Sequence, residues 1–172
     1  MKPARMAIAL AFSMIVASAA LAFNFAPADQ PKAVPEIEFL DAEGNAMTLE
    51  DFRGQVVVLN LWATWCAPCR REMPSLDRLQ AEHGGQDLQV VALSQDRGDS
   101  LDKIREFYDE VGVQHLAIYR DPEAKAAREL RAPGLPTTIV IDRQGREVGR
   151  VLGDAQWDSK AAVELLEAVM AQ

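Results

Sequence analysis

Two cysteines separated by two residues stand where an apolar strand gives way to a helix, and this junction constrains the fold most. Residues 56–62 form a continuous apolar run interrupted only by Asn60, and their β-branched start predicts a short buried strand. Trp65-Cys66-Ala67-Pro68-Cys69 follows, and a helical pattern then runs to about His83. Two intervening residues let both sulfurs meet across the first helical turn. The fold must therefore place a small disulfide loop at the junction of a buried strand and a helix.

The remaining pattern predicts one α/β domain with a mixed central sheet flanked by helices. Parallel strands joined by helices come first, and an antiparallel hairpin around Arg143-Gln144-Gly145 comes near the end. We expect further strands at 36–40, 88–93, 116–119, 137–141 and 147–152. A single helical turn capped by Thr48 is expected at 49–52. Helices are expected at 101–111, at 121–130 and after a cap at Asp158 or Ser159.

The N-terminal residues are typical of an export signal. Lys2 and Arg5 precede an uncharged apolar segment over residues 7–23, which lies at the lower limit for a membrane span. Ala17-Ser18-Ala19 would suit a signal peptidase, so residues 1–23 are expected to be a membrane anchor or a cleaved signal. Either outcome places the domain outside the cytoplasm, in the periplasm of a bacterium, where residues 7–23 could tether it to the inner membrane.

Residues 24–33 contain Pro27 and Pro31 and little that could pack, which favours a semi-extended linker. The folded domain is then expected over residues 34–172. We expect a monomer, because nothing in the sequence suggests an obligate dimer.

Charge excludes several classes of function. The chain has 18 basic and 26 acidic residues, for a formal net charge of −8. An acidic body of this kind repels phosphate, so we expect no nucleic-acid partner. Two histidines are too few for most histidine-rich metal sites. We therefore expect no metal and no cofactor, and we assign the chemistry to the cysteine pair.

Position on the helix predicts different roles for the two cysteines. Cys66 would lie at the helix start, where the unpaired N–H groups and the helix dipole stabilise a thiolate. Cys69 lies one turn deeper and four residues before Met73, which belongs with Leu76 to the core face. Cys69 should therefore be the more buried sulfur. We expect Cys66 to attack or to be attacked, and Cys69 to resolve the mixed disulfide.

The cysteine pair could also serve three other purposes. A structural disulfide closing so small a loop would add little stability. A zinc site needs a second pair of ligands, and His83 and His115 belong to no recognisable motif. A copper site is chemically feasible, because thiolates suit Cu(I).

A second motif, Gly134-Leu135-Pro136-Thr137-Thr138, sets a proline directly before a strand, which makes Pro136 a candidate for a cis bond. Together with WCAPC, this motif resembles the thioredoxin superfamily. The continuations CRREMPSL and GLPTTIVIDRQGREVGR most resemble its TlpA/ResA branch of exported thiol–disulfide oxidoreductases. The resemblance implies a thioredoxin fold with an N-terminal β extension and an insertion after the second core strand.

The same resemblance implies a substrate-binding surface beside the disulfide. Pro136 would be cis and close to the cysteines, and the backbone of Leu135 would pair with a bound peptide. Thr137 belongs to the same motif and is included in the surface. Trp65, which directly precedes Cys66, is expected to add apolar docking area, whereas Trp62 is expected in the core.

Asn60 departs from the pattern of many thioredoxins, which carry a buried acid at the matching position. An amide cannot accept a proton from the resolving thiol. Glu72, three residues after Cys69, is a candidate replacement, and the TlpA/ResA branch has a glutamate there too. The alternative is a solvent-exposed helix glutamate that pairs with neighbouring arginines.

The Ala67-Pro68 dipeptide contains no histidine to stabilise the Cys66 thiolate further, so we expect a reductase of protein disulfides. Its electrons would come from a membrane donor. The resemblance points to maturation of apocytochrome c or of the cytochrome oxidase copper site through its assembly factors.

Two other functions remain in competition. DAEGNAMTLEDFRG also resembles the peroxiredoxin relatives, which favours a thiol peroxidase, although Thr64 lies two residues before Cys66 where those proteins have three. The second competing function is that of a Cu(I) carrier for oxidase assembly. Sco-type carriers resemble this fold but separate their cysteines by three residues and supply a distant histidine.

Overall fold

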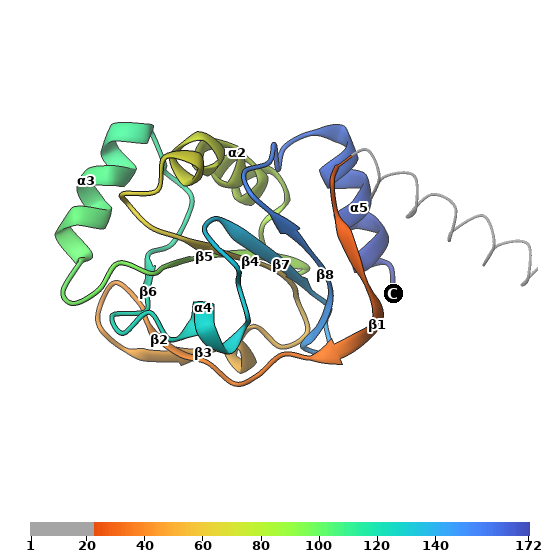
Figure 1. The fold of residues 1–172 in the computed structure, drawn as a ribbon. Helices are drawn as coiled ribbons and strands as arrows, with labels where there is room; N and C mark the ends of the chain where they lie inside the picture. The colour runs from red at the N-terminus through yellow and green to blue at the C-terminus, as the bar shows by residue number, and fades with distance from the viewer. Residues whose placement is uncertain (1–22) are drawn as a thin grey trace, which may run out of the picture.

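The computed structural model describes residues 23–172, so the export signal or anchor expected at residues 1–23 lies outside the described part except for Phe23. An eight-stranded mixed sheet forms its centre, in the order β1-β8-β7-β4-β5-β6-β2-β3, with helices against it (Figure 1). The strands are β1 Ala26–Ala33, β2 Glu38–Leu40, β3 Ala46–Thr48, β4 Val56–Trp62, β5 Leu88–Ser94, β6 Tyr119–Arg120, β7 Thr137–Ile141 and β8 Arg146–Leu152. The helices are the 3-10 turn η1 Leu49–Phe52, α2 Ala67–His83, α3 Leu101–Val111, α4 Ala126–Glu129 and α5 Lys160–Met170.

Strand β4 lies in the middle of the sheet and positions the cysteine motif. It runs parallel to β5 and antiparallel to β7. Val58 and Trp62 face the hydrophobic cluster that includes residues of α2, α3 and α5, whereas Leu59 and Leu61 face the cluster that includes residues of η1 and α4. Because side chains alternate along a strand, Asn60 lies on the α2 side.

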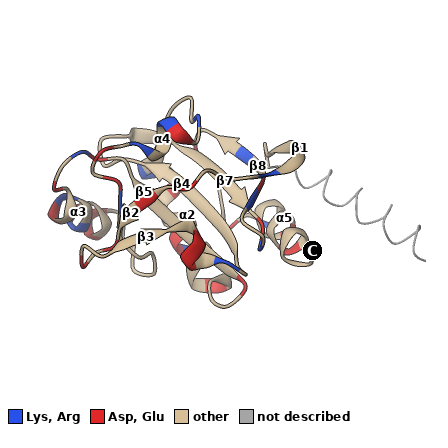
Figure 2. Cartoon of the chain, turned by 90° about the horizontal axis from the view of Figure 1, so that it is seen from below, with Lys and Arg blue, Asp and Glu red and all other residues tan. Residues whose placement is uncertain are grey.

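Charged side chains lie mainly on the helices and loops around the sheet. In Figure 2, β4 and β7 carry no charged residue, whereas α3 carries basic and acidic residues along its length. Within residues 23–172, no helix is both long and apolar enough to cross a membrane.

The fold class is the one expected: a thioredoxin-type mixed sheet flanked by helices. The hairpin of β2 and β3 forms the N-terminal β extension. Helix α3 and strand β6 lie between β5 and α4, where the insertion was expected. Helix α2 runs continuously through Pro74.

The linker expected at residues 24–33 was wrong, because most of this segment is strand β1. It pairs antiparallel with β8, from Ala26 opposite Arg150 to Ala33 opposite Arg146. Its side chains are almost all exposed, so no apolar alternation marked it as a strand. Prolines are tolerated there because β1 is an edge strand.

The expected strand 116–119 and helix 121–130 are both shorter than predicted. The carboxylate of Asp77 accepts the backbone N–H groups of residues 114–116 at 2.6 to 3.1 Å, so these residues bond to a side chain and only Tyr119–Arg120 pair in the sheet. Ala124 has a left-handed backbone (φ 51°), which delays the helix, and Ala126–Glu129 alone form α4.

Candidate active site

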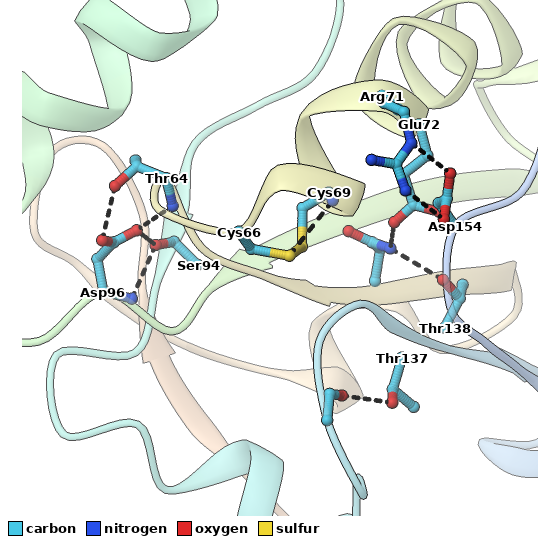
Figure 3. The surroundings of a disulfide bond; sticks show 12 residues. Thr64, Cys66, Cys69, Arg71, Glu72, Ser94, Asp96, Thr137, Thr138 and Asp154 are labelled. Atoms are coloured by element: carbon cyan, nitrogen blue, oxygen red, sulfur yellow. Dashed lines mark hydrogen bonds and ion pairs between the residues drawn. A yellow bond between two sulfur atoms is a disulfide. The ribbon is translucent and has the colours of Figure 1, made fainter.

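Cys66 and Cys69 form a disulfide at the start of helix α2, with an S–S distance of 2.05 Å (Figure 3). Cys66 is the N-cap of the helix, and its sulfur accepts the backbone N–H of Cys69 at 3.3 Å. Cys69 is completely buried, whereas Cys66 remains 4% exposed. Of the two cysteines, only Cys66 keeps any exposed surface, and it lies at the positive end of the helix dipole.

Glu72 lies completely buried one turn after Cys69, so the expected alternative of a solvent-exposed glutamate is wrong. Its carboxylate accepts three hydrogen bonds. The donors are the side-chain amide of Asn60 at 2.7 Å, the backbone N–H of Ala155 at 3.2 Å and the indole N–H of Trp157 at 3.3 Å. The two residues singled out in the sequence, Asn60 and Glu72, are therefore direct partners.

Burial of Glu72 raises its pKa to about 7, because the charged form loses its hydration. The hydrogen bonds from Asn60, Trp157 and Ala155 oppose this rise, and the nearby carboxylate of Asp154 adds to it. Asp154 is itself paired with Arg71 at 3.0 Å (Figure 3). A carboxyl group with this pKa can hold or release a proton near neutral pH, as a general base or acid must.

Asn60 links three elements around the site. Its Nδ2 donates to Glu72 on α2 and also to the Thr138 hydroxyl on β7 at 2.9 Å. Its Oδ1 is buried and has no partner within residues 23–172. The amide therefore fixes the carboxylate against the sheet without being able to titrate.

Asp96, which follows β5, holds the loop that precedes Cys66. Its carboxylate accepts both the backbone N–H and the hydroxyl of Thr64, each at 2.8 Å (Figure 3). Burial pushes the pKa of Asp96 upward, but hydrogen bonds from Thr64, Ser94 and Lys103 together keep it below its ordinary value. Asp96 is thus a charged clamp on the approach to the reactive cysteine.

The cis bond expected at Leu135–Pro136 is present. Thr137 lies opposite Leu61 in the sheet, so Pro136 lies at the edge where β4 leads into the cysteine motif. The Pro136 carbonyl accepts the N–H of Gly153 at 3.0 Å. Within residues 23–172, the backbone of Leu135 takes part in no hydrogen bond, so both of its polar groups are available to a peptide.

Two large apolar side chains are exposed at this edge. Trp65 is 70% exposed directly before Cys66, whereas Trp62 is fully buried in the core, as expected. Leu152 is 50% exposed and lies opposite Thr137 in the β7–β8 pair. Exposed apolar side chains rimmed by polar groups are typical of a docking surface.

Sequence analysis missed Trp157, Asp96 and Leu152 as site residues. Trp157 bonds to Glu72, Asp96 bonds to Thr64 and Leu152 pairs with Thr137, and none of the three belongs to a local motif. The one available signal was for Asp96, because side chains directly after parallel strands gather at the same edge of the sheet.

Histidines do not join the cysteines. The backbone N–H of His115 bonds to Asp77, and His83 is the last residue of α2. Within residues 23–172, no three His, Cys, Asp or Glu side chains are grouped so that they could hold a metal ion.

Residues 31–147 match the AhpC/TSA family. The chain is 30% identical over 123 residues to the thiol-disulfide oxidoreductase ResA of Bacillus thuringiensis (strain Al Hakam), covering 72% of this chain and 69% of that protein. A crystal structure assigned to the thiol:disulfide interchange protein DsbE of Chlorobium tepidum superposes with a TM-score of 0.72 at 28% identity, over 83% of this chain and 98% of that one. The crystal structure of a DsbF homologue from Corynebacterium diphtheriae superposes with a TM-score of 0.66 at 29% identity, over 86% of this chain and 91% of that one.

Proposed function

Because the chain belongs to the AhpC/TSA family and is a ResA-like thiol–disulfide oxidoreductase of the thioredoxin superfamily, we propose that it is an exported reductase of protein disulfides. The observation that carries this proposal is the combination at the start of α2. Cys66, the less buried cysteine, lies at the helix N-terminus, Cys69 is completely buried, and a carboxyl group with a pKa of about 7 lies one turn further.

The first step of the proposed reaction belongs to Cys66. In the dithiol form its thiolate is stabilised by the helix dipole and by the N–H groups at the start of α2. It attacks one sulfur of the substrate disulfide, forms a mixed disulfide and expels the other substrate sulfur as a thiolate.

The second step needs Cys69 as a thiolate, and its burial disfavours that charge. Glu72 accepts the Cys69 proton, because it lies on the same side of α2 three residues away and titrates near neutral pH. The Cys69 thiolate then attacks the Cys66 sulfur. This closes the 66–69 disulfide and releases the second substrate thiolate, so two electrons have moved to the substrate.

The proposed docking surface consists of Trp65, Leu135 and Leu152, with the cis peptide bond at Pro136 shaping the turn beside them. Thr137, expected in this surface, is 1% exposed and its hydroxyl donates to the Gly134 carbonyl at 2.8 Å, so it supports the turn from inside. Trp65 and Leu152 offer apolar contact, and the unpaired backbone of Leu135 can add a strand of substrate peptide. A protein disulfide in an extended segment fits this surface better than a small compact disulfide.

We place the enzyme in the periplasm, delivered by residues 1–23 as a cleaved signal or a membrane anchor and acting as a monomer. Electrons then come from a membrane donor, because that compartment is kept oxidising. The resemblance to the TlpA/ResA branch supports substrates from the maturation of apocytochrome c or of the oxidase copper site.

Trapping of the mixed disulfide tests the proposal. Cys69→Ser should accumulate a covalent complex with a protein disulfide substrate, and a thiol reductant should release it. Cys66→Ser should accumulate none, although it keeps one cysteine. Equal trapping by both variants would overturn the assignment of roles.

A thiol peroxidase is the second candidate, because residues 41–54, which resemble the peroxiredoxin relatives, lie within the AhpC/TSA match. Peroxide consumption by the reduced protein faster than by a free thiol would support it. For the Cu(I) carrier, retention of Cu(I) by the reduced protein against a moderate chelator is the corresponding test.

A further inference from the structure

We propose that Phe23 and Trp157 are positioning residues for Glu72, and that the segment leading into β1 thereby seals the proton acceptor of the active site from water. The inference deepens the proposed function, because it concerns the environment of the group to which that function assigns the proton of Cys69. It requires Phe23 to stay attached to the domain, as it does in an uncleaved anchor or after cleavage at Ala17-Ser18-Ala19.

Trp157 forms the inner part of this seal. It lies in the loop before α5 and is fully buried, and its indole N–H donates to Glu72 Oε2 at 3.3 Å. Its backbone N–H bonds to the Ser75 hydroxyl on α2 at 3.1 Å, and the same hydroxyl donates to the Glu72 carbonyl at 2.7 Å. The ring is thus held from two points against the turn of α2 that carries Glu72.

Phe23 forms the outer part. Its ring meets Trp157 edge to face, with centroids 4.8 Å apart and an interplanar angle of 76°, and it is only 7% exposed. Edge-to-face aromatic pairs of this kind stabilise one relative orientation of the two rings. Phe23 therefore packs directly on the buried indole that donates to Glu72.

A glycine on β8 shows that this segment is seated closely. A Cβ atom on Gly149 would lie 2.3 Å from the ring of Phe25 and 2.6 Å from the carbonyl oxygen of Ala26. Phe25 is 7% exposed and Pro27 lies opposite Gly149 in the sheet. Only a residue without a side chain leaves room for this approach, so Phe25, two residues after Phe23, is closely fitted to β8.

Few ionisable groups face Glu72 from the elements around it. Asp154 approaches from the loop after β8 and is paired with Arg71 of α2. The Cys66 and Cys69 thiols of the reduced form lie on α2 itself. Strands β4 and β7 contribute the uncharged side chains of Asn60 and Thr138. Admission of water is therefore the change that should move the titration of Glu72 most.

The test follows the indole N–H resonance of Trp157 by NMR as the pH is varied, in the oxidised, ¹⁵N-labelled full-length chain in detergent micelles. Trp157→Phe assigns the signal, and the indoles of Trp62 and Trp65 serve as internal references. In the unmutated protein we expect a titration step near pH 7 that Glu72→Gln abolishes. Phe23→Ala should move the midpoint about one pH unit lower, because a hydrated carboxyl ionises more readily.

Phe52→Ala is the matched control, because Phe52 is 8% exposed and also packs edge to face, against Tyr119 in the other hydrophobic cluster. It should lower stability without moving the midpoint. Phe23→Leu keeps most of the buried volume, so it provides a second test if Phe23→Ala folds poorly. Its midpoint should move in the same direction as that of Phe23→Ala, by a smaller amount.

An unchanged midpoint in both Phe23 variants would overturn the proposal, as would a titration step that survives in Glu72→Gln. No substrate takes part in this measurement. Its outcome is therefore independent of whether the protein reduces disulfides, and failure of the proposed function would be seen in the trapping experiment instead.

Discussion

The amide of Asn60 in the central strand donates a 2.7 Å hydrogen bond to the carboxylate of Glu72 on helix α2, and both side chains are fully buried. The strand position thus supplies a fixed donor, and the helix supplies the group that titrates. A proton acceptor for the buried thiol is present, but it comes from the helix rather than from the strand.

Glu72→Gln should remove a pH dependence of stability. The pKa of Glu72 is raised from 4.5 in the unfolded chain to about 7 in the folded protein. The protonated carboxyl group therefore stabilises the fold fully below pH 4.5, and this stabilisation is lost as the pH rises through about 7. The loss amounts to about 3 kcal/mol. Urea unfolding of the oxidised protein at pH 4.5 and pH 8 checks it. Glu82→Gln, at an exposed glutamate of the same helix, should keep the full dependence.

Asn60→Asp should couple two buried carboxyl groups at hydrogen-bond distance. Two such groups cannot both ionise easily, so the pair should hold one proton to a higher pH than Glu72 does alone. The variant should therefore be destabilised more at pH 8 than at pH 5. Asn60→Leu, which removes the donor without adding charge, should show a weaker dependence. Equal destabilisation by Asn60→Asp at both pH values would contradict the contact.

Asp96→Ala should loosen the loop before Cys66, because the N–H and hydroxyl of Thr64 lose their acceptor. We expect a loss of about 1–3 kcal/mol in the free energy of unfolding. Asp109→Ala is the control, since Asp109 is an exposed residue near the end of α3 and its loss should cost almost nothing. Chemical denaturation at neutral pH compares the two variants. An equal loss of unfolding free energy in both would show that Asp96 does not hold this loop.

Trp65→Ala should slow the reduction of a protein disulfide several-fold but leave the reduction of oxidised glutathione nearly unchanged. The reason is that Trp65 is 70% exposed and lies outside the core, so it contributes contact area rather than stability. Leu152→Ala should have the same effect, smaller in size. Parallel rate measurements with the two substrates check this, and equal slowing of both would argue against a docking role.

The sequence predicted most of the fold because the apolar runs of β4, β5 and β7 are buried and bounded by turn residues. Spacing along the chain, together with the resemblance to thioredoxins and the TlpA/ResA branch, also singled out Asn60 and Glu72 as residues close to the cysteines. It could not predict that they touch, since that contact depends on how α2 lies across β4. Strand β1 was missed for another reason: its stability comes from backbone pairing and from Phe23 and Phe25, which precede it.

An equilibrium redox titration of the Cys66–Cys69 pair in the full-length protein tests the central claim most directly, with the fluorescence of Trp65 as the readout. A reductase requires a potential at or below about −230 mV, close to that of thioredoxins and glutaredoxins. We predict a value in that range. A potential above about −180 mV would contradict the account, because it would make the protein an oxidase or an isomerase.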